Sequence, residues 1–413
     1  MDNPSLPSII PALAGRRILL GVSGSIAGYK AVDLASRLTQ AGALVDVVLT
    51  ESARRFVSAL TFSSVTGRRT FTDDDLWGPD SHILHVGLGR EAELLVVAPA
   101  TAHTMAKLAA GQGDGLLCLA ALSSHAPLVL APAMDAGMFE HPATQANLTT
   151  LRQRGAVIVG PVEGRMASGL VGLGRMVEPV DLVGHIRRAL GQGRSLAGRR
   201  VVVTAGGTFE PIDPVRIIAN RSSGKQGFAL AQAALDRGAE VTLITGPTTL
   251  PTPVGAERFD VETADEMRRE VEERLDRTDV LLMAAAVADF RAQASSQDKI
   301  KRSAGAIDLH LEPTADILGM VAERRRRSGG PKVVVGFAAE SSDLILRARQ
   351  KVKAKGLDLI VANDITAPDA GFAVDTNRVT FVDSSEGVQA LPLMSKADVA
   401  EAVLDRVEAI LRQ

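Results

Sequence analysis

The sequence predicts an α/β protein with two Rossmann-like domains, each built on a doubly wound parallel sheet. In both halves of the chain, short apolar runs alternate with longer amphipathic stretches, a pattern typical of βαβ units. Each half also begins with an apolar run that leads through glycines into a helix. The chain has 413 residues, 46% hydrophobic but only 3% aromatic, so we expect cores of Ala, Val, Leu and Ile, as in parallel sheets covered by helices.

The first domain is expected over residues 1–190. A strand at 17–22 leads through the glycines of GVSGSIAGYK into a helix that ends near Gln40, and a second strand covers 45–49. Later strands are expected at 94–98, 128–131 and 156–159, helices at 101–111, 142–154 and 181–190, and a glycine-rich loop at 164–174. Ligands of such sheets bind at the carboxyl ends of the strands. We therefore expect one site, formed by 21–26, 50–52, 99–104 and 132–135.

The small, polar segment 191–196 is the expected linker to the second domain, residues 197–413. The alternation of strands and helices resumes there. The expected elements are strands at 201–204, 240–245, 280–284, 333–338 and 359–362, helices at 224–238 and 342–355, a hairpin-like pair at 378–382 and 388–392, and a terminal helix.

The stretch 201–228 is the strongest candidate for a phosphate-binding site. A strand runs into two glycines, a long polar segment follows, and a helix then begins at the sequence SSG. Glycine turns and helix N-termini offer free N–H groups to anions. The spacing fits neither a Walker loop nor G-x-G-x-x-G. Arg216, Asn220 and Arg221 are unusual in a mere connector, although a solvated loop is the alternative.

Hydroxyl side chains are expected at the strand ends of the first domain. Ser25, Thr50 and Ser52 suit a monophosphate, and the glycine spacing departs from the dinucleotide fingerprint. Glu51 supports the alternative, because it stands where an NAD site has its ribose-binding acid.

His82 and His85 lie three residues apart before the strand at 94–98. They are candidates for a general acid or base, for structural residues, or for metal ligands, although no third ligand lies near them in sequence. The single cysteine, Cys118, excludes an internal disulfide and a multi-cysteine metal site, and we expect it to be a small buried residue.

Composition also excludes several partners. The net charge of −2 provides no basic field for nucleic acid. No segment reaches the ~18 uninterrupted apolar residues of a membrane span, and the N-terminus, with Pro4, Pro7 and Pro11, lacks a signal-peptide pattern. We therefore expect a cytoplasmic protein without nucleic-acid or membrane partners.

Several motifs of the second half resemble one family. DPVR at 213–216, Asn220 and SSGK at 222–225 are similar to the ligase half of the bacterial bifunctional flavoproteins of coenzyme A biosynthesis, phosphopantothenoylcysteine decarboxylase/phosphopantothenate–cysteine ligase. AAVADF at 285–290, KIK at 299–301, GFAAE at 336–340 and AND at 362–364 follow in family order. The resemblance implies that 4′-phosphopantothenate condenses with cysteine through an acyl-cytidylate. CTP would be the co-substrate, and Mg²⁺ would bind through its phosphates.

The resemblance also implies roles for individual residues. Asn220 would hold the acyl phosphate, Arg216 the substrate phosphate or carboxylate, and Lys299 the developing negative charge. The other implied substrate and nucleotide contacts of this half are Ser222, Ser223, Gly224, Lys225, Ala285, Ala286, Asp289, Phe337, Lys351 and Lys355.

The first half resembles the flavin-binding half of the same family. His82 matches the active-site histidine, APAT at 98–101 the flavin-binding motif, and PAM at 132–134 a motif whose Met134 would contact the substrate. The resemblance implies FMN-dependent decarboxylation of phosphopantothenoylcysteine to 4′-phosphopantetheine. The implied cofactor contacts are Gly24, Ser25, Ile26, Thr50, Ser52, Ala98, Pro99, Ala100 and Thr101.

This half departs from the family pattern at three positions. Asp135 stands where Asn is usual, Ser168 where the flap usually carries a catalytic Cys, and His103 where Asn is common. We still expect Asp135 and Ser168 to be catalytic, together with His82. The family's assembly implies a homo-oligomer with a trimeric flavin domain and a dimeric ligase domain. The alternatives are an active ligase with a catalytically impaired FMN-binding scaffold, a flavin-binding regulatory protein and an NAD(P) dehydrogenase.

Overall fold

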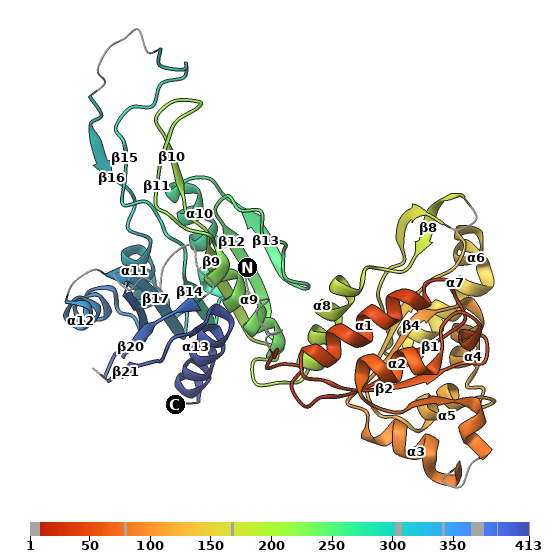
Figure 1. Cartoon of the computed structure of the whole chain (residues 1–413). Coiled ribbons are helices and arrows are strands. Elements are labelled where there is room, and N and C mark those ends of the chain that lie inside the picture. Colours follow the sequence, from red (N-terminus) through yellow and green to blue (C-terminus); the bar gives the residue numbers. More distant parts are fainter. Residues whose placement is uncertain are drawn as a thin grey trace, which may run out of the picture. The chain divides into compact units, whose positions relative to one another are not determined.

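A parallel sheet organises each of the two units into which the chain divides, Met1–Gly191 and Gln192–Gln413 (Figure 1). The computed structural model describes residues 9–77, 81–166, 169–301, 308–340, 343–364, 376–385 and 387–412, without the side chains of 81, 82, 340 and 364. No helix in these described stretches has both the length and the apolar character that crossing a bilayer requires.

The sheet of the first unit has six strands in the order β3-β2-β1-β4-β5-β6, and every neighbouring pair is parallel. All residues of β4 are buried, as expected for a strand that is covered on both faces. The strands are β1 (Arg17–Val22), β2 (Leu44–Leu49), β3 (Thr70–Thr72), β4 (Leu94–Ala100), β5 (Leu128–Pro132) and β6 (Val157–Ile158).

Helices cover both faces of this sheet, so the predicted doubly wound fold is confirmed. The helices α1 (Gly28–Gln40), α2 (Ala59–Thr66) and α8 (Pro179–Gly191) pack on one face. The other face carries α3 (Ser81–Glu91), α4 (Ala102–Ala110), α5 (Leu116–Ser123) and α7 (Pro142–Gln153). The short helices are α6 (Ala136–Glu140) and the 3₁₀ turns η1 (Ala53–Arg55) and η2 (Asp73–Trp77).

The segment expected as a glycine-rich loop at 164–174 is instead part of an antiparallel hairpin, β7 (Val162–Arg165) and β8 (Val171–Arg175). The hairpin is fastened to the end of β5, because the N–H of Met134 donates to the carbonyl of Gly174 at 3.1 Å. A Cβ at position 174 would lie 2.2 Å from the carbonyl oxygen of Met134. Glycine is therefore required for this close approach.

The sheet of the second unit has eight strands in the order β13-β12-β9-β14-β17-β18-β20-β21. The first six run parallel, and β20 and β21 add an antiparallel edge. The strands are β9 (Arg200–Ala205), β12 (Glu240–Thr245), β13 (Glu257–Asp260), β14 (Val280–Met283), β17 (Val333–Glu340), β18 (Leu359–Asp364), β20 (Val379–Asp383) and β21 (Val388–Ala390).

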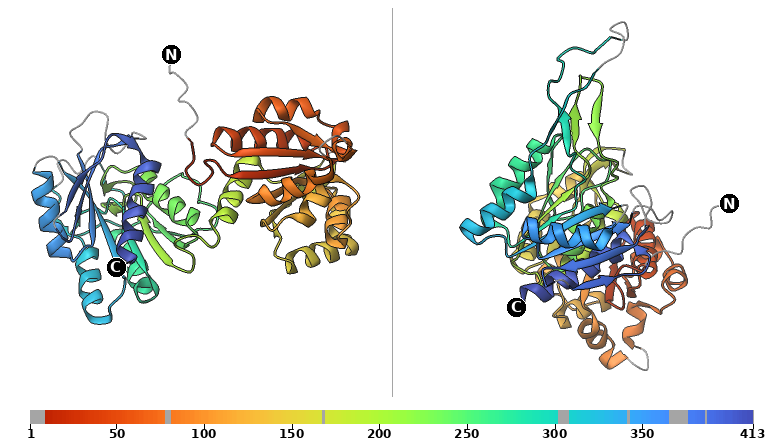
Figure 2. Two further views of the ribbon diagram at one scale, coloured as in Figure 1. Left: turned by 90° about the horizontal axis from the view of Figure 1, so that it is seen from below. Right: turned by 90° about the vertical axis from the view of Figure 1, so that its left-hand side faces the viewer.

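Helices again cover both faces, as Figure 2 shows from below. One face packs against α9 (Lys225–Asp236) and α13 (Lys396–Leu411). The other packs against α10 (Ala264–Arg274), α11 (Ile317–Ser328) and α12 (Leu344–Lys355). The same unit also contains the turn η3 (Leu275–Arg277) and the pair β19 (Thr376–Asn377) and β22 (Met394–Ser395).

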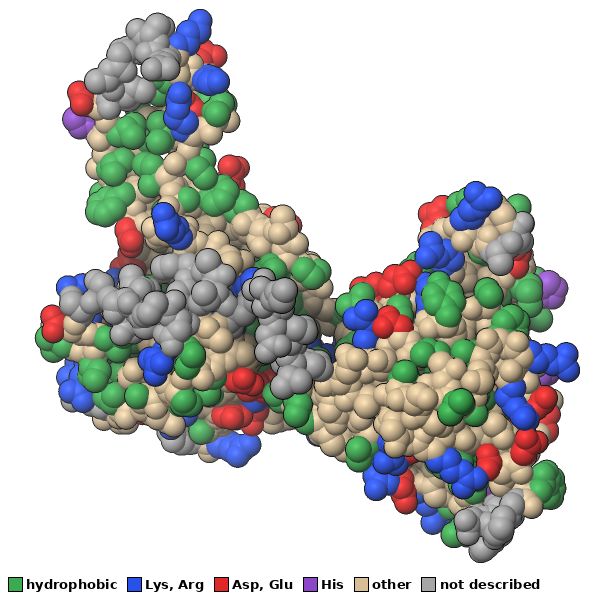
Figure 3. Space-filling view, viewed as in Figure 1, with side chains coloured by type: hydrophobic (Ala, Val, Ile, Leu, Met, Phe, Trp, Pro, Cys, Tyr) green, Lys and Arg blue, Asp and Glu red, His purple; other side chains and the backbone are tan. Residues whose placement is uncertain are grey.

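Two antiparallel ribbons project from the second unit as an arm (Figures 1 and 2). One pairs β10 (Phe209–Pro211) with β11 (Ile217–Ala219), and the other pairs β15 (Phe290–Ala292) with β16 (Leu311–Pro313). Hydrophobic side chains gather on the surface of the arm (Figure 3). The exposed ones are Val215, Ile217, Phe290, Leu309 and Leu311.

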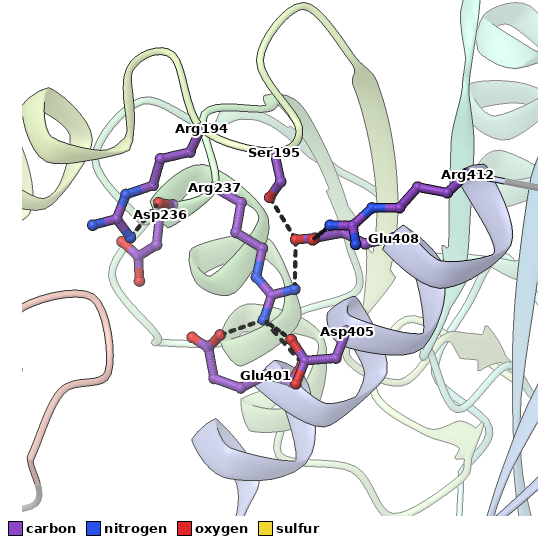
Figure 4. A network of polar contacts seen from close by, with 8 residues as sticks. All are labelled: Arg194, Ser195, Asp236, Arg237, Glu401, Asp405, Glu408 and Arg412. Carbon is purple, nitrogen blue, oxygen red and sulfur yellow. Dashed lines mark hydrogen bonds and ion pairs between the residues drawn. The ribbon is translucent and has the colours of Figure 1, made fainter.

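The start of the second unit is anchored by a largely buried arginine (Figure 4). Arg237, at the end of α9, donates to Glu401 at 2.7 Å, to Asp405 at 2.7 Å and to Glu408 at 2.8 Å, all on α13. Ser195 binds the same Glu408 through its hydroxyl group at 2.5 Å. Ser195 thus ties the segment that enters the unit to α13, and Arg237 ties α13 to α9.

Candidate functional sites

A pocket of about 920 Å³ lies in the first unit, at the carboxyl ends of β1, β2, β4 and β5. This is the place that the sequence predicted for a ligand of such a sheet. The predicted residues that line it are Gly24, Ser25, Ile26, Thr50, Ser52, Thr101, Met134 and Asp135.

The strand ends meet at this pocket because Ser23 joins two of them. Its hydroxyl donates to the carbonyl of Pro99 at 2.7 Å and accepts the N–H of Thr101 at 2.9 Å. A Cβ at Gly24 would lie 2.4 Å from the Cβ of Ser52, so glycine permits the ends of β1 and β2 to touch. The sequence placed Ser23 within the expected site at 21–26 but indicated no role for it.

Three of the predicted cofactor contacts do not line the pocket. Ala98, Pro99 and Ala100 belong to β4, and both alanine side chains are fully buried. Only Thr101 of this motif reaches the wall, where its hydroxyl caps α4 by accepting the N–H of Thr104 at 3.4 Å. The motif therefore contributes its backbone geometry to the site more than its side chains.

Two lysines on the pocket wall already have partners. Lys30 is buried and donates to the carbonyl of Met176 at 2.8 Å and to Glu178 at 2.7 Å. Lys107 forms an ion pair with Asp114 at 2.7 Å, and this hydrogen bond lowers the pKa of Asp114. Their charges are thus partly neutralised before any ligand binds.

Cys118 lies on the wall of the same pocket and is buried, as predicted. Burial raises the pKa of its thiol to about 11. A thiol of this kind stays protonated at neutral pH, so it is a poor nucleophile and a poor metal ligand.

The remaining predicted residues of this unit have different positions. Ser168 and the side chain of His82, the second residue of α3, lie outside the described part of the chain. Asp135 caps α6 by accepting the N–H of Gly137 at 3.1 Å. Glu51, the alternative ribose-binding acid, forms an ion pair with Arg54 at 3.0 Å.

A second pocket, of about 800 Å³, lies in the second unit beside the carboxyl ends of β14, β17 and β18. It brings together motifs that are far apart in the sequence. The predicted residues that line it are Asn220, Ser222, Ser223, Gly224, Lys225, Ala285, Ala286, Asp289, Phe337, Lys351 and Lys355.

The N-terminus of α9 faces this pocket without a side-chain cap. Its N-cap residue, Gly224, has a φ of 74°, a conformation that glycine adopts without strain. The first N–H groups of the helix are therefore available to an anion, and the helix dipole favours a negative charge there. Gly246 allows the neighbouring turn to close, because a Cβ there would lie 2.0 Å from the carbonyl oxygen of Gly207.

Hydrogen bonds hold the segment 285–289 against the same turn. The N–H of Ala286 donates to the carbonyl of Gly206 at 2.8 Å, and Asn220 donates its side-chain N–H to the carbonyl of Val287 at 2.9 Å. Asn220 thus connects the two predicted motifs at the pocket wall.

Asp316 also lines this pocket and was not predicted from the sequence. It caps α11 by accepting the N–H of Gly319 at 2.9 Å, and it pairs with Lys355. Burial opposes its charged form, but hydrogen bonds from Lys355 and Gly319 outweigh burial and lower its pKa. Arg221 is exposed and also lines this pocket, and in contrast to Asp316 it forms no hydrogen bond or ion pair with another described residue.

Arg216 and Lys299 are not brought into this pocket. Arg216 lies in the turn between β10 and β11, where it pairs with Asp213. Lys299 is exposed and precedes Ile300, which contacts the same turn. Both cations therefore belong to the arm.

The two halves of the chain match two family profiles. Residues 11–191 match the flavoprotein family, and residues 196–411 match the DNA/pantothenate metabolism flavoprotein C-terminal domain. The crystal structure of the C-terminal domain of the coenzyme A biosynthesis bifunctional protein CoaBC is 35% identical, with a TM-score of 0.45, and covers 53% of this chain and 99% of that one.

Two doubly wound units, each with a ligand pocket at its strand ends, define the chain as a two-domain α/β flavoprotein. Relatives extend over almost its whole length. The coenzyme A biosynthesis bifunctional protein CoaBC of Bacillus subtilis (strain 168) is 44% identical over 404 residues, 97% of this chain and 98% of the relative. The protein of that name from Vibrio cholerae is 44% identical over 397 residues, 95% of this chain and 98% of the relative. The chain belongs to the family of coenzyme A biosynthesis bifunctional proteins.

Proposed function

We propose that the chain catalyses two successive reactions of coenzyme A biosynthesis. Residues 197–413 would join 4′-phosphopantothenate to cysteine at the expense of CTP. Residues 1–190 would decarboxylate phosphopantothenoylcysteine to 4′-phosphopantetheine with FMN. The observation that carries the proposal is the convergence of the 220–225 and 285–289 motifs on one pocket, at the uncapped start of α9. The family matches of both halves support the division of the two activities.

The ligase pocket suits activation of a carboxylate by a nucleotide. In the first step, the substrate carboxylate oxygen bonds to the α-phosphorus of CTP, and the bond from that phosphorus to the bridging oxygen breaks, so that pyrophosphate leaves with the electron pair. The N–H groups at the start of α9, which no side chain caps, and the neighbouring Ser222 and Ser223 suit the triphosphate. Asn220, fixed to the carbonyl of Val287, would hold the acyl phosphate.

The second step consumes the acyl-cytidylate. The cysteine amine attacks the acyl carbon, CMP leaves with the electron pair of the acyl–oxygen bond, and the amine loses a proton. Lys299 would balance the charge that develops on the leaving phosphate.

Mg²⁺ fits this pocket as a companion of the nucleotide. The described residues contain no group of three or more His, Cys, Asp or Glu side chains that could hold a metal. Asp289 and Asp316 line the pocket, but Asp316 is already paired with Lys355. Mg²⁺ commonly binds through phosphates, water and one or two carboxylates. The phosphates of CTP would therefore supply most of its ligands.

Arg216 and Lys299 lie on the arm and not in the pocket, so the oligomeric state of the ligase half bears on how they contact a substrate. These cations can reach a substrate in the pocket if the arm bends, or if the arm of a second copy supplies them. We propose that the ligase half forms a homodimer. The exposed apolar side chains of the arm support an interface there.

The pocket of the first unit fits FMN. The hydroxyl groups of Ser25, Thr50 and Ser52 suit its phosphate, and Ile26 and Met134 offer apolar contacts for its ring. When bound, FMN supplies reversible hydride transfer with the cysteine moiety, which allows CO₂ to leave. We propose the trimeric assembly of this half that the family resemblance implies.

His82, Asp135 and Ser168 are the proposed catalytic residues of the decarboxylase. Asp135 is fixed at the pocket wall by its hydrogen bond to the N–H of Gly137. The Asn that is usual at this position in the family can donate a hydrogen bond, whereas an ionised carboxylate can only accept one. His82 and Ser168 would move protons, and the hydroxyl of Ser168 is a weaker acid than the thiol usual there.

Turnover by the purified full chain tests the proposal. With 4′-phosphopantothenate, cysteine and CTP, we expect a yellow protein that releases CMP, pyrophosphate, CO₂ and 4′-phosphopantetheine. Asn220→Asp should stop the ligase at the acyl-cytidylate and leave decarboxylation of added phosphopantothenoylcysteine intact. No CTP-dependent product from the parent protein would contradict the proposed function. Equal loss of both activities in Asn220→Asp would remove the specific role of Asn220.

A further inference from the structure

The turn at the end of the arm contains a carboxylate that the proposed reaction does not use. The side chain of Asp213 is fully buried between β10 and β11. Its Oδ1 accepts the N–H of Val215 at 2.8 Å and that of Arg216 at 2.8 Å. Its Oδ2 accepts the N–H of Ile300 at 3.2 Å and also pairs with the guanidinium of Arg216.

Ile300 is held at both of its backbone groups. Its N–H donates to Asp213, and its carbonyl accepts from Nη1 of Arg216 at 3.2 Å. A further contact joins the same segments, because the N–H of Ser296 donates to the carbonyl of Ile212 at 2.9 Å. Arg216 and Ile300 are 84 residues apart in the sequence. These bonds therefore fix one distant loop of the arm onto the turn of another.

The contacts leave two cations available to a ligand. Arg216 uses Nη1 for its bonds to described residues, so its other N–H donors remain open, and its side chain is 43% exposed. Lys299, directly before Ile300, is exposed and forms no hydrogen bond or ion pair within the described part of the chain. A guanidinium and an ammonium group held on neighbouring segments suit a phosphate or carboxylate.

We propose that Asp213 is a positioning residue, which holds Arg216 and Lys299 together as one anion-binding unit. The inference rests on the proposed function, which supplies the anion: the phosphate or the activated carboxylate of 4′-phosphopantothenate. Asp213 itself does not touch this ligand. Without its carboxylate, the guanidinium of Arg216 and the N–H of Ile300 would face each other with no acceptor between them, and the loop would leave the turn.

Asp213→Asn separates the contacts that Asp213 makes within its own turn from its contact with the loop at Ile300. The amide oxygen can still accept the N–H groups of Val215 and Arg216, so the turn should survive. The amide nitrogen is a donor and would face the N–H of Ile300 and the guanidinium, so the contact with the loop should open. Asp298→Asn is the matched control, because Asp298 is exposed in the same loop and the substitution removes the same charge.

Hydrogen exchange on the full chain measures this contact without relying on activity. We expect peptides that cover 296–301 to exchange about ten to a hundred times faster in Asp213→Asn than in the parent, the ratio that one charge-assisted hydrogen bond provides. In Asp298→Asn, we expect the same peptides to exchange at the parent rate. Equal exchange in the parent and in Asp213→Asn would overturn the inference. If Asp213→Asn does not fold, Asp213→Glu is measured in the same way, because its longer side chain cannot satisfy the turn and the loop together.

Ligase rates then test whether Asp213 acts through Lys299. We expect Asp213→Asn to lower kcat about tenfold, with little change in the KM for cysteine, as for a misplaced catalytic group. Its effect on kcat should be much smaller in Lys299→Ala than in the parent, because one of the two cations that it positions is then missing. If the two effects multiply, Asp213 does not act through Lys299 and only this inference falls. If Lys299→Ala keeps the parent rate, the proposed role of Lys299 fails as well.

Discussion

Replacing Arg237 by methionine should destabilise the second unit strongly. The guanidinium is only 11% exposed and binds three carboxylates of α13, among which Glu408 is 15% and Glu401 22% exposed. Methionine keeps an apolar stem of similar length, so most of the packing is retained. The substitution therefore removes mainly the charge. It leaves Glu401 without its cation and Glu408 with only the exposed Arg412.

The magnitude follows from how deeply each pair is buried. Removing one partner of a buried ion pair costs about 3–5 kcal/mol, because the other charge stays desolvated. Asp405 is 72% exposed, so its pair with Arg237 adds little. We therefore expect Arg237→Met to lower the free energy of unfolding by about 3 kcal/mol, the lower end of that range. For a unit of 150–250 residues, this corresponds to a fall in Tm of about 6–12 °C.

Calorimetry of the full chain, with the transition of each unit followed separately, measures this fall. Arg412→Met is the control, since Arg412 also binds Glu408, at 3.2 Å, but is 75% exposed. We expect that control to change the Tm by about 2 °C or less. The reasoning is refuted if Arg237→Met lowers the Tm no more than Arg412→Met does.

The pH dependence gives a second test of the same explanation. Burial already raises the pKa of Glu401 despite its bond to Arg237, and removing Arg237 should raise it further. A carboxyl group with a raised folded-state pKa binds more protons in the folded state, so stability falls as the pH rises through that pKa. The deficit of Arg237→Met should therefore shrink as the pH is lowered from about 7 toward about 5.

Three further predictions concern the two pockets. Gly174→Ala should displace the hairpin from Met134 and weaken flavin retention several-fold, measured by release of flavin fluorescence, while ligase activity is unchanged. Arg221→Met should weaken binding of CTP about tenfold but that of CMP little, by titration calorimetry, with the exposed Arg326→Met as control. Cys118, whose thiol has a pKa of about 11, should be alkylated at pH 8 at least about a hundred times more slowly in the folded protein than after unfolding. Its alkylation, followed by mass spectrometry, should become faster as the pH rises.

The sequence predicted the central strands well because their signal is local. Strand β1 has the expected bounds, and β4 extends only two residues beyond the expected 94–98. Both are continuous apolar runs, as strands covered on both faces must be. The hairpin β7–β8 was expected as a loop, because its glycines hide the alternation of side chains that marks a strand. In the arm, the ribbon of β15 and β16 was missed because these strands pair across a long intervening segment.

The sequence predicted those residues of the site that lie at the ends of the sheet strands. Ser25, Thr50 and Thr101 are far apart in the sequence but share one pocket, because parallel strands end at the same edge of the sheet. Arg216 and Lys299 could not be placed in this way, since they lie on the arm rather than at a strand end of the sheet. Asp316 precedes a helix in the manner of an N-cap, but nothing in the local sequence marks it as part of a pocket wall.

The anchoring of the chain at the start of the second unit sets where its gene can be divided. Leu196 is fully buried in the core of that unit, and its N–H donates to the carbonyl of Arg237 at 2.9 Å. A fragment that begins at residue 197 would lack this leucine and the bond of Ser195 to Glu408. The void left by a buried leucine alone costs about 2–5 kcal/mol. Separate expression of the two halves therefore requires the cut to fall at Gln192 or Gly193, so that Arg194, Ser195 and Leu196 stay with the ligase.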